Sequence, residues 1–229
     1  MDAFLAEGFS RLGLDDGDQV LPHLLRYIEE IELFNPAYGL VRVQNRRELI
    51  VKHILDSLAP LAILRGLLDE TASGVPAISD VGSGAGLPGI PLALCMNSAE
   101  FTLIERMGRR AGFLRNVQAA LGLSNVRVEE AEMEKIPSAG FDLVVFRAFR
   151  PLEGPILKGL FRLLKKGGTL AAYKGRRESV EEEMAGALEA AEKGAGPSIG
   201  FWEALPLNVP FLEEERHLLV IKAPESFCP

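Results

Sequence analysis

The sequence predicts an α/β fold, in which a mostly parallel, twisted sheet carries helices on both faces and follows a helical extension. Two observations support this prediction. From residue 77 onward, short apolar runs alternate with amphipathic stretches, and a glycine-rich segment follows the first apolar run. Strands that alternate with helices are typical of parallel sheets covered on both faces. We therefore expect an N-terminal extension over residues 1–72, packed on a core over residues 73–229 in one compact domain.

The extension is expected to contain two long amphipathic helices. Apolar residues recur every three or four positions over residues 20–34 and again over residues 48–64. The first helix should end before Asn35-Pro36, because proline disfavours helical backbone in the residue that precedes it. Residues 73–76, Ser-Gly-Val-Pro, then separate the extension from the core.

The core is expected to alternate between strands and helices before it ends in a pair of strands. Predicted strands cover residues 77–81, 101–104, 126–128, 143–146 and 169–173, and predicted helices cover residues 90–96, 109–121, 153–164 and 178–191. The last apolar runs, residues 199–205 and 217–221, read as two further strands that add an antiparallel end to the sheet.

The first core strand runs into a glycine-rich loop that predicts a cofactor site. Asp80 lies at the strand end, and glycines follow at positions 82, 84, 86 and 89. Glycine tolerates positive φ and lets a ligand approach the main chain closely. The next helix, expected to begin near Pro88, offers unpaired N–H groups at its start. This arrangement is typical of loops that bind nucleotide-type cofactors.

Two cofactors are compatible with the loop. Read from Gly84, the spacing Gly-x-Gly-x-x-Gly matches the dinucleotide fingerprint and indicates an NAD-dependent oxidoreductase. Read from Asp80, the spacing Asp-x-Gly-x-Gly-x-Gly resembles motif I of the S-adenosylmethionine-dependent Rossmann-like methyltransferases. There the acidic residue would face the positively charged methionine end of the ligand. Asp80 at the strand end, together with Pro88 and Pro91 close behind, favours the methyltransferase.

Two further segments follow strand ends on the cofactor side. Glu105 ends the second strand, where an acid accepts hydrogen bonds from ribose hydroxyls in nucleotide-binding folds. The alternative is an acid that complements a helix dipole. Met133 and Glu134 follow the third strand, beside the expected place of an adenine, although the same residues could simply start a helix.

The substrate side is expected at the ends of the fourth and fifth strands. Arg147, between Phe146 and Phe149, could pair with a carboxylate, stack on a base or cap a helix. Lys174 could contact phosphate or substrate, or be a solvated strand end. His53 lies on a helix outside the sheet, where a lone histidine is more often structural. The edge carries no Asn/Asp-Pro-Pro-aromatic motif, no cysteine nucleophile and no metal-ligand spacing.

Composition narrows the class of protein. The net charge of −7 argues against nonspecific coating of nucleic acid, although basic residues cluster locally, as at Arg42, Arg46 and Arg47. No apolar run approaches the ~20 residues of a membrane span. The acidic N-terminus lacks a signal-peptide pattern, and two cysteines make a disulfide framework improbable. We expect a cytoplasmic protein with no membrane association. Because Arg46, Arg47 and Lys52 precede the sheet, we also expect the extension to engage the substrate.

Several separated segments together resemble one family. They are Asn35-Pro-Ala-Tyr38, Val51-Lys-His-Ile-Leu-Asp-Ser57, Asp80 to Pro91, Phe101 to Arg110, Phe113-Leu-Arg-Asn-Val-Gln118, Arg147-Ala-Phe149, Leu164-Lys-Lys-Gly-Gly168, Lys174-Gly175 and Glu215-Arg-His-Leu-Leu-Val-Ile-Lys222. They look like the bacterial small-subunit ribosomal RNA methyltransferase G family, also called glucose-inhibited division protein B. The resemblance runs from about residue 20 to residue 223 and departs at Gly39-Leu40-Val41, where the family usually has Asn-Leu-Thr.

The resemblance implies S-adenosylmethionine-dependent methylation of guanine N7 in 16S ribosomal RNA near the decoding site, with the RNA or the small ribosomal subunit as partner. No catalytic base is expected, because guanine N7 carries a lone pair and no proton. A noncatalytic cofactor- or RNA-binding module remains the alternative from another class. Taken together, residues and resemblance assign the cofactor to Asp80, Gly82, Gly84, Gly86, Leu87, Glu105, Met133, Glu134 and Arg147, and substrate positioning to His53, Arg147 and Lys174.

Overall fold

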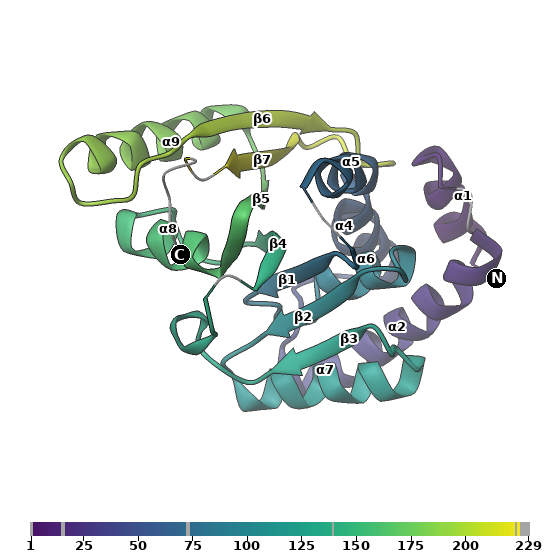
Figure 1. Cartoon of the computed structure of the whole chain (residues 1–229). Coiled ribbons are helices and arrows are strands. Elements are labelled where there is room, and N and C mark those ends of the chain that lie inside the picture. Colours follow the sequence, from purple (N-terminus) through teal and green to yellow (C-terminus); the bar gives the residue numbers. More distant parts are fainter. Residues whose placement is uncertain (1, 15–16, 72–73, 139, 223, 225–229) are drawn as a thin grey trace.

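The computed structural model describes residues 2–14, 17–71, 74–138, 140–222 and 224. Its centre is a seven-stranded sheet with the order β3-β2-β1-β4-β5-β7-β6 (Figure 1). The strands are β1 (Ala77–Val81), β2 (Glu100–Ile104), β3 (Val126–Glu129), β4 (Phe141–Arg147), β5 (Leu164–Lys174), β6 (Phe201–Leu207) and β7 (Arg216–Lys222). β1 to β5 pair in parallel, whereas β7 runs antiparallel to both β5 and β6. The predicted fold class and its antiparallel end are confirmed.

Helices cover both faces of the sheet because successive strand residues point to opposite sides. In β4, Leu143 and Val145 point into the hydrophobic core on one face of the sheet, and Val144 and Phe146 point into the core on the other face. The core helices are α6 (Gly89–Cys95), α7 (Gly108–Leu121), α8 (Gly154–Leu163) and α9 (Arg177–Glu192), and a 3-10 turn, η2, covers Met133–Lys135. Each predicted core helix is present, with bounds that differ by a few residues.

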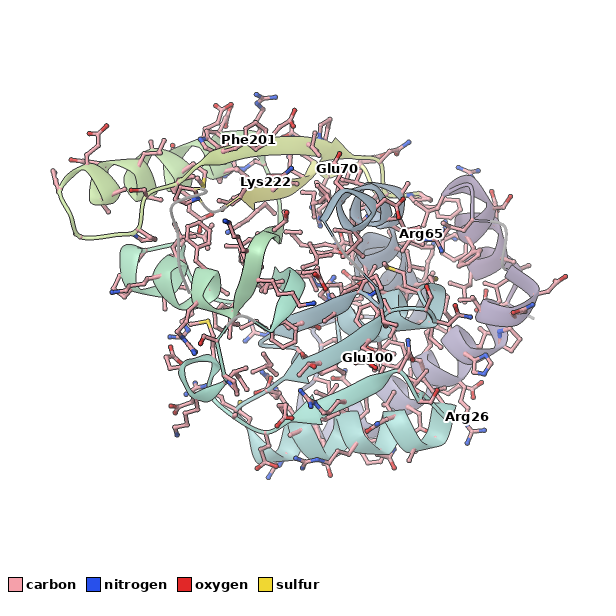
Figure 2. All side chains as sticks on the ribbon, in the orientation of Figure 1. Arg26, Arg65, Glu70, Glu100, Phe201 and Lys222 are labelled. Carbon is pink, nitrogen blue, oxygen red and sulfur yellow. The ribbon has the colours of Figure 1, made fainter. Side chains whose placement is uncertain are left out.

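The described residues before position 72 are mainly helical and share their hydrophobic core with one face of the sheet. They form α1 (Ala3–Arg11), α2 (Gly17–Tyr38), α3 (Arg46–Leu49), a π-helix η1 (Ile50–Leu55), α4 (Asp56–Leu58) and α5 (Leu61–Thr71). At the other end of the chain, Lys222 of β7 pairs with Glu70 of α5 at 3.4 Å (Figure 2). The extension thus lies against both the middle and the antiparallel end of the sheet.

Three details of the extension differ from the prediction. α2 does not end before Asn35-Pro36 but continues to Tyr38. The missing N–H of proline costs one hydrogen bond near the helix end. Ring contacts offset this loss, because Phe34 packs on Tyr38 and Phe113 with centroids 5.4 and 5.6 Å away. The helix expected over residues 48–64 is divided by the π-helix and by a turn before α5. α1 was not expected, although its cap Asp2 is a typical start signal.

In the part of the chain that the structure describes, no helix combines the length and the apolar character that a membrane crossing requires.

Candidate functional site

Two adjoining cavities open at the carboxyl edge of the parallel strands, where open α/β sheets hold their ligands. The smaller, about 500 Å³, lies beside the glycine loop and the ends of β2 and β3. The larger, about 1040 Å³, lies between the ends of β4 and β5 and the π-helical segment of the extension. Ala148, Phe149 and Arg150, which follow β4, line both cavities. Ala148 has a φ of 49°, a strained conformation that is found most often at functional sites.

The glycine loop borders the smaller cavity through Gly82. This residue has a φ of +73°, and a Cβ atom there would lie 2.6 Å from the Phe149 ring. Gly84, with a φ of +58°, donates its N–H to Glu105 Oε2 at 2.9 Å. Both conformations are ones that glycine adopts without strain. The loop therefore keeps its main chain open toward the cavity at Gly82 and anchored to β2 at Gly84.

Glu105 holds the loop and lines the smaller cavity. The residue is 4% exposed. One oxygen accepts the Gly84 N–H, and the other accepts the N–H of Met107 at 2.8 Å. Each carboxylate oxygen has a second lone pair. Binding of a ribose by Glu105 therefore stays a prediction, with the residue at a suitable place.

Asp80 lies beneath the loop rather than in the described wall of either cavity. It is fully buried, and Oδ2 accepts the N–H of Gly89 at the start of α6 at 2.9 Å. Oδ1 has no hydrogen-bond partner among the described residues. Burial raises the pKa of Asp80 to about 7, against the Gly89 hydrogen bond and the positive charge of Arg147, which lower it. Its contact with the methionine end of a cofactor stays a prediction.

We expect Asp80→Asn to gain stability relative to the wild type as the pH rises. The pKa of Asp80 is about 7 in the folded protein and near 3.8 when unperturbed, so proton binding favours the folded state. This contribution is complete below about pH 4 and is lost as the pH rises through about 7. Asparagine mimics the neutral acid and can still accept from Gly89. Melting temperatures of both proteins at pH 4.5 to 8 would measure the difference, and a constant difference would show that Asp80 does not titrate there.

Gly86 and Leu87 are the part of the glycine loop that packs against the hydrophobic core. A Cβ atom on Gly86 would lie 2.6 Å from Ile90 and 3.0 Å from Leu114. Leu87 is 5% exposed and belongs to the core. The structure therefore gives both residues packing contacts, and their direct contact with a cofactor stays a prediction.

Met133 and Glu134 line the smaller cavity opposite the glycine loop, as their position after β3 predicts. Met133 is buried, and its carbonyl accepts from Arg162 at 2.9 Å, which fixes this short segment against α8. Glu134 is exposed and pairs with Arg150 at 3.1 Å. Sequence reasoning did not single out Met107, whose exposed side chain also lines this cavity.

The larger cavity is rich in cations although the protein is acidic. Its lining includes six cationic side chains and three carboxylates, namely Arg42, Lys52, Arg147, Arg150, Lys174 and Arg216 with Asp56, Glu182 and Glu183. Within this set Lys174 is paired with Glu183 of α9. Lys174 therefore lies at the expected place, but another residue already compensates its charge.

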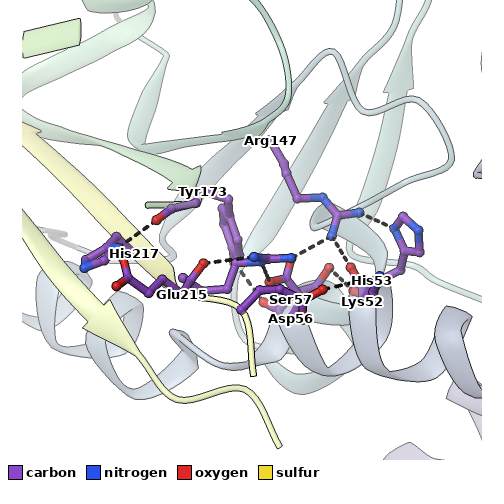
Figure 3. A network of polar contacts seen from close by, with 11 residues as sticks. Lys52, His53, Asp56, Ser57, Arg147, Tyr173, Glu215 and His217 are labelled. Atoms are coloured by element: carbon purple, nitrogen blue, oxygen red, sulfur yellow. Dashed lines mark hydrogen bonds and ion pairs between the residues drawn. The ribbon is translucent and has the colours of Figure 1, made fainter. Parts of the chain in front are cut away.

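Arg147 points from the end of β4 toward the extension (Figure 3). Nη1 binds Asp56 Oδ2 at 2.8 Å and the Lys52 carbonyl at 3.2 Å, and Nη2 lies 3.0 Å from His53 Nδ1. Because arginine only donates, His53 Nδ1 must accept. Burial and the charge of Arg147 lower the pKa of His53 to about 4, so its ring is neutral at pH 7. Two of the three residues predicted to position the substrate, His53 and Arg147, are thus in direct contact.

Sequence reasoning missed Asp56 and Arg216 as members of this site. Asp56 is 3% exposed, and its second oxygen binds Arg216 Nε at 3.1 Å. Tyr173 of β5 donates to the Ser57 carbonyl at 2.8 Å and adds a further link between the sheet and the extension. The available signal was the segment from Val51 to Ser57, which carried the family resemblance without a role for its aspartate.

The three basic residues from which substrate engagement by the extension was predicted, Arg46, Arg47 and Lys52, all have partners within the protein. Arg46 pairs with Glu32 at 2.9 Å, and the Arg47 guanidinium lies 4.0 Å from the centre of the Phe4 ring. Lys52 pairs with Glu48 at 3.1 Å, and it alone of the three lines the larger cavity. Substrate engagement by this group stays a prediction, for which Lys52 is the best-placed member.

Metal ligation finds no support in the described ranges, where no three His, Cys, Asp or Glu side chains form a group that could hold an ion.

Comparison with known proteins identifies relatives of this chain. A family model described as rRNA small subunit methyltransferase G matches residues 20–204. A protein named Ribosomal RNA small subunit methyltransferase G from Treponema pallidum (strain Nichols) is 38% identical over 232 residues, which cover 99% of this chain and 96% of the relative. One of the same name from Xanthomonas campestris pv. campestris (strain B100) is 39% identical over 222 residues, covering 96% and 94%.

Solved structures resemble the fold. A SAM-dependent methyltransferase from Aquifex aeolicus has a TM-score of 0.51 at 22% identity and covers 74% of this chain and 90% of that one. A SAM-dependent O-methyltransferase from Thermotoga maritima has a TM-score of 0.51 at 16% identity and covers 89% and 72%. At such identities the likeness concerns the fold alone.

Proposed function

Since the chain belongs to the rRNA small subunit methyltransferase G family, we propose that it methylates N7 of a guanine in 16S ribosomal RNA with S-adenosylmethionine as the donor. The observation that carries this proposal is the pair of adjoining cavities that share Ala148, Phe149 and Arg150. A donor in the smaller cavity and a base in the larger one would meet at this shared wall. We also propose a cytoplasmic location, because the proposed substrate is ribosomal RNA.

The residues around the smaller cavity fit the proposed cofactor. Gly82 leaves the main chain open, and Glu105 presents a carboxylate where ribose hydroxyls can donate. Met107 and Met133 supply apolar, polarizable surface for a purine. When bound, the cofactor supplies an electrophilic sulfonium methyl group. The dinucleotide interpretation of the glycine spacing loses its support, because the family is one of methyltransferases.

The chain's own residues have an orienting task in this reaction. Guanine N7 already carries a lone pair and no proton, so no side chain has to remove one. His53 is neutral, but its Nδ1 accepts a hydrogen bond from Arg147, so this nitrogen is not free to act as a base toward the guanine. Side chains held in fixed positions lower the barrier to methyl transfer in two ways: they orient the guanine toward the methyl group, and they tolerate the positive charge that moves onto the base. The cations of the larger cavity suit the phosphates that flank a target nucleotide.

We expect the protein to transfer tritiated methyl groups from S-adenosylmethionine to bacterial 16S rRNA, with 7-methylguanosine as the labelled nucleoside after digestion. Naked RNA and assembled small subunits, tested in parallel, identify the preferred form of the substrate. Phosphate contacts should make the apparent affinity fall with added salt. Cofactor binding without transfer to either substrate would support a noncatalytic module, and label on another atom would contradict N7 as the acceptor.

A further inference from the structure

The guanidinium of Arg147 is fixed mainly by one short segment of the extension. Three of its contacts go to residues 52–56, and among the described residues Asp56 is the carboxylate within ion-pair distance of it. The remaining two partners, a carbonyl and a neutral imidazole, carry no net charge. Charge-assisted hydrogen bonds are shorter and stronger than neutral ones. The orientation of Arg147 therefore depends most on Asp56.

Asp56 is shared between two arginines that come from distant parts of the chain. Oδ2 binds Arg147 at the end of β4 (Figure 3). Oδ1 binds Arg216 at the start of β7. Both arginines and Asp56 line the larger cavity. One carboxylate thus connects the extension, the central sheet and the antiparallel end at the wall of the proposed substrate cavity.

The π-helix explains how Asp56 and its neighbours reach Arg147 together. The Asp56 N–H bonds to the carbonyls of Val51 and His53, and the carbonyl of Lys52 accepts from Arg147. Widened turns of this kind occur mostly within α-helices and frequently at functional sites. This irregular turn directs three groups toward the Arg147 guanidinium: the Lys52 carbonyl, the His53 imidazole nitrogen and the Asp56 carboxylate.

Stability alone is a weak reason for this arrangement. A buried ion pair adds little net stability over apolar side chains of similar size, because removing charges from water costs about as much as their attraction returns. The chain contains a second buried carboxylate in an ion pair, whose cationic partner is more exposed than Arg147. Asp142, 5% exposed, binds Lys165 at 2.8 Å and the Ala77 N–H at 2.8 Å, at the opposite end of β4. What distinguishes Asp56 is its place beside the cavity.

We propose that Asp56 is a positioning residue, which sets the Arg147 guanidinium for methyl transfer and couples it to Arg216. This inference rests on the proposed function, since it assigns Asp56 to the same reaction. Asp56 acts on the reaction through its bond to Arg147.

A double-mutant cycle tests the proposal. Asp56→Asn keeps the shape of the side chain but removes its charge, and we expect kcat for methyl transfer to fall about tenfold, with a smaller change in KM for RNA. In an Arg147→Lys background the same substitution should lower kcat by no more than about twofold, because residues that act as one unit are not additive. Asp142→Asn is the matched control and should leave kcat unchanged in both backgrounds.

Two outcomes overturn the proposal. Asp56→Asn could retain the wild-type kcat, or its loss could be fully additive with that of Arg147→Lys. Heteronuclear NMR of the Arg147 side-chain N–H groups, assigned by their absence in Arg147→Lys, provides a readout without activity. Asp56→Asn should shift these signals and speed their exchange, and Asp142→Asn should not. If the wild type transfers no methyl group, the proposed function fails, while the NMR comparison still decides whether Asp56 fixes Arg147.

Discussion

Replacing Gly82 with valine is expected to weaken cofactor binding by about a hundredfold or more. Gly82 has a φ of +73° and lines the smaller cavity, and even a Cβ atom would approach the Phe149 ring to 2.6 Å. A β-branched side chain would strain the backbone by roughly 1–3 kcal/mol and fill the space next to the main chain. We expect the affinity for S-adenosylhomocysteine, measured by calorimetry, to fall by about a hundredfold or more, which corresponds to about 2.7 kcal/mol.

Gly122→Val separates strain from loss of space. Gly122 has a φ of +64° at the end of α7, and an added Cβ would meet no atom within 4 Å. This variant should lose stability for the same backbone reason but keep the wild-type affinity. If Gly82→Val binds as tightly as the wild type at a comparable melting temperature, the smaller cavity is not the cofactor site.

The parts of the fold that follow from local pattern could be predicted from the sequence. β1 matches its predicted range because an apolar run is bounded by Pro76 on one side and the glycine loop on the other. β5 is longer than predicted, because Lys165 to Gly168 continue the strand without an apolar pattern. Likewise, α2 passes Pro36 because ring contacts with distant α7 offset a local penalty. Local rules fail where the compensation comes from another part of the chain.

The same reasoning explains what was found and missed in the site. Strand ends place Glu105 and Arg147 at the carboxyl edge, because parallel strands end on the same side. The partners of Arg147 were not predictable from local pattern. Asp56 lies 91 positions before Arg147 in the chain, and its second partner, Arg216, lies 160 positions after Asp56. The sequence placed Asp80 correctly near the end of β1. Because side chains alternate along a strand, Asp80 points to the same face of the sheet as Ile78, where it lies under the loop and bonds to the start of α6.

Arg147→Lys is expected to lower methyl transfer by about tenfold or more, because ~1.4 kcal/mol of lost orientation already costs a factor of ten. The net charge and the position at the end of β4 are retained. A guanidinium binds a carboxylate, a carbonyl and a ring nitrogen at once, as Arg147 does, whereas an ammonium is a point charge on a flexible stem. Single-turnover rates with saturating cofactor and RNA measure the effect without a contribution from binding.

The control for this substitution is Arg65→Lys. Arg65 of α5 also links the extension to the core, because it donates to the Cys95 carbonyl at 2.7 Å, but it does not line either cavity. It should keep the wild-type rate. Equal rates for Arg147→Lys and the wild type, at equal melting temperature, would mean that Arg147 only joins the extension to the sheet. A loss confined to Arg147→Lys would instead show that the guanidinium geometry matters for the reaction, because both variants remove a guanidinium that links the extension to the core.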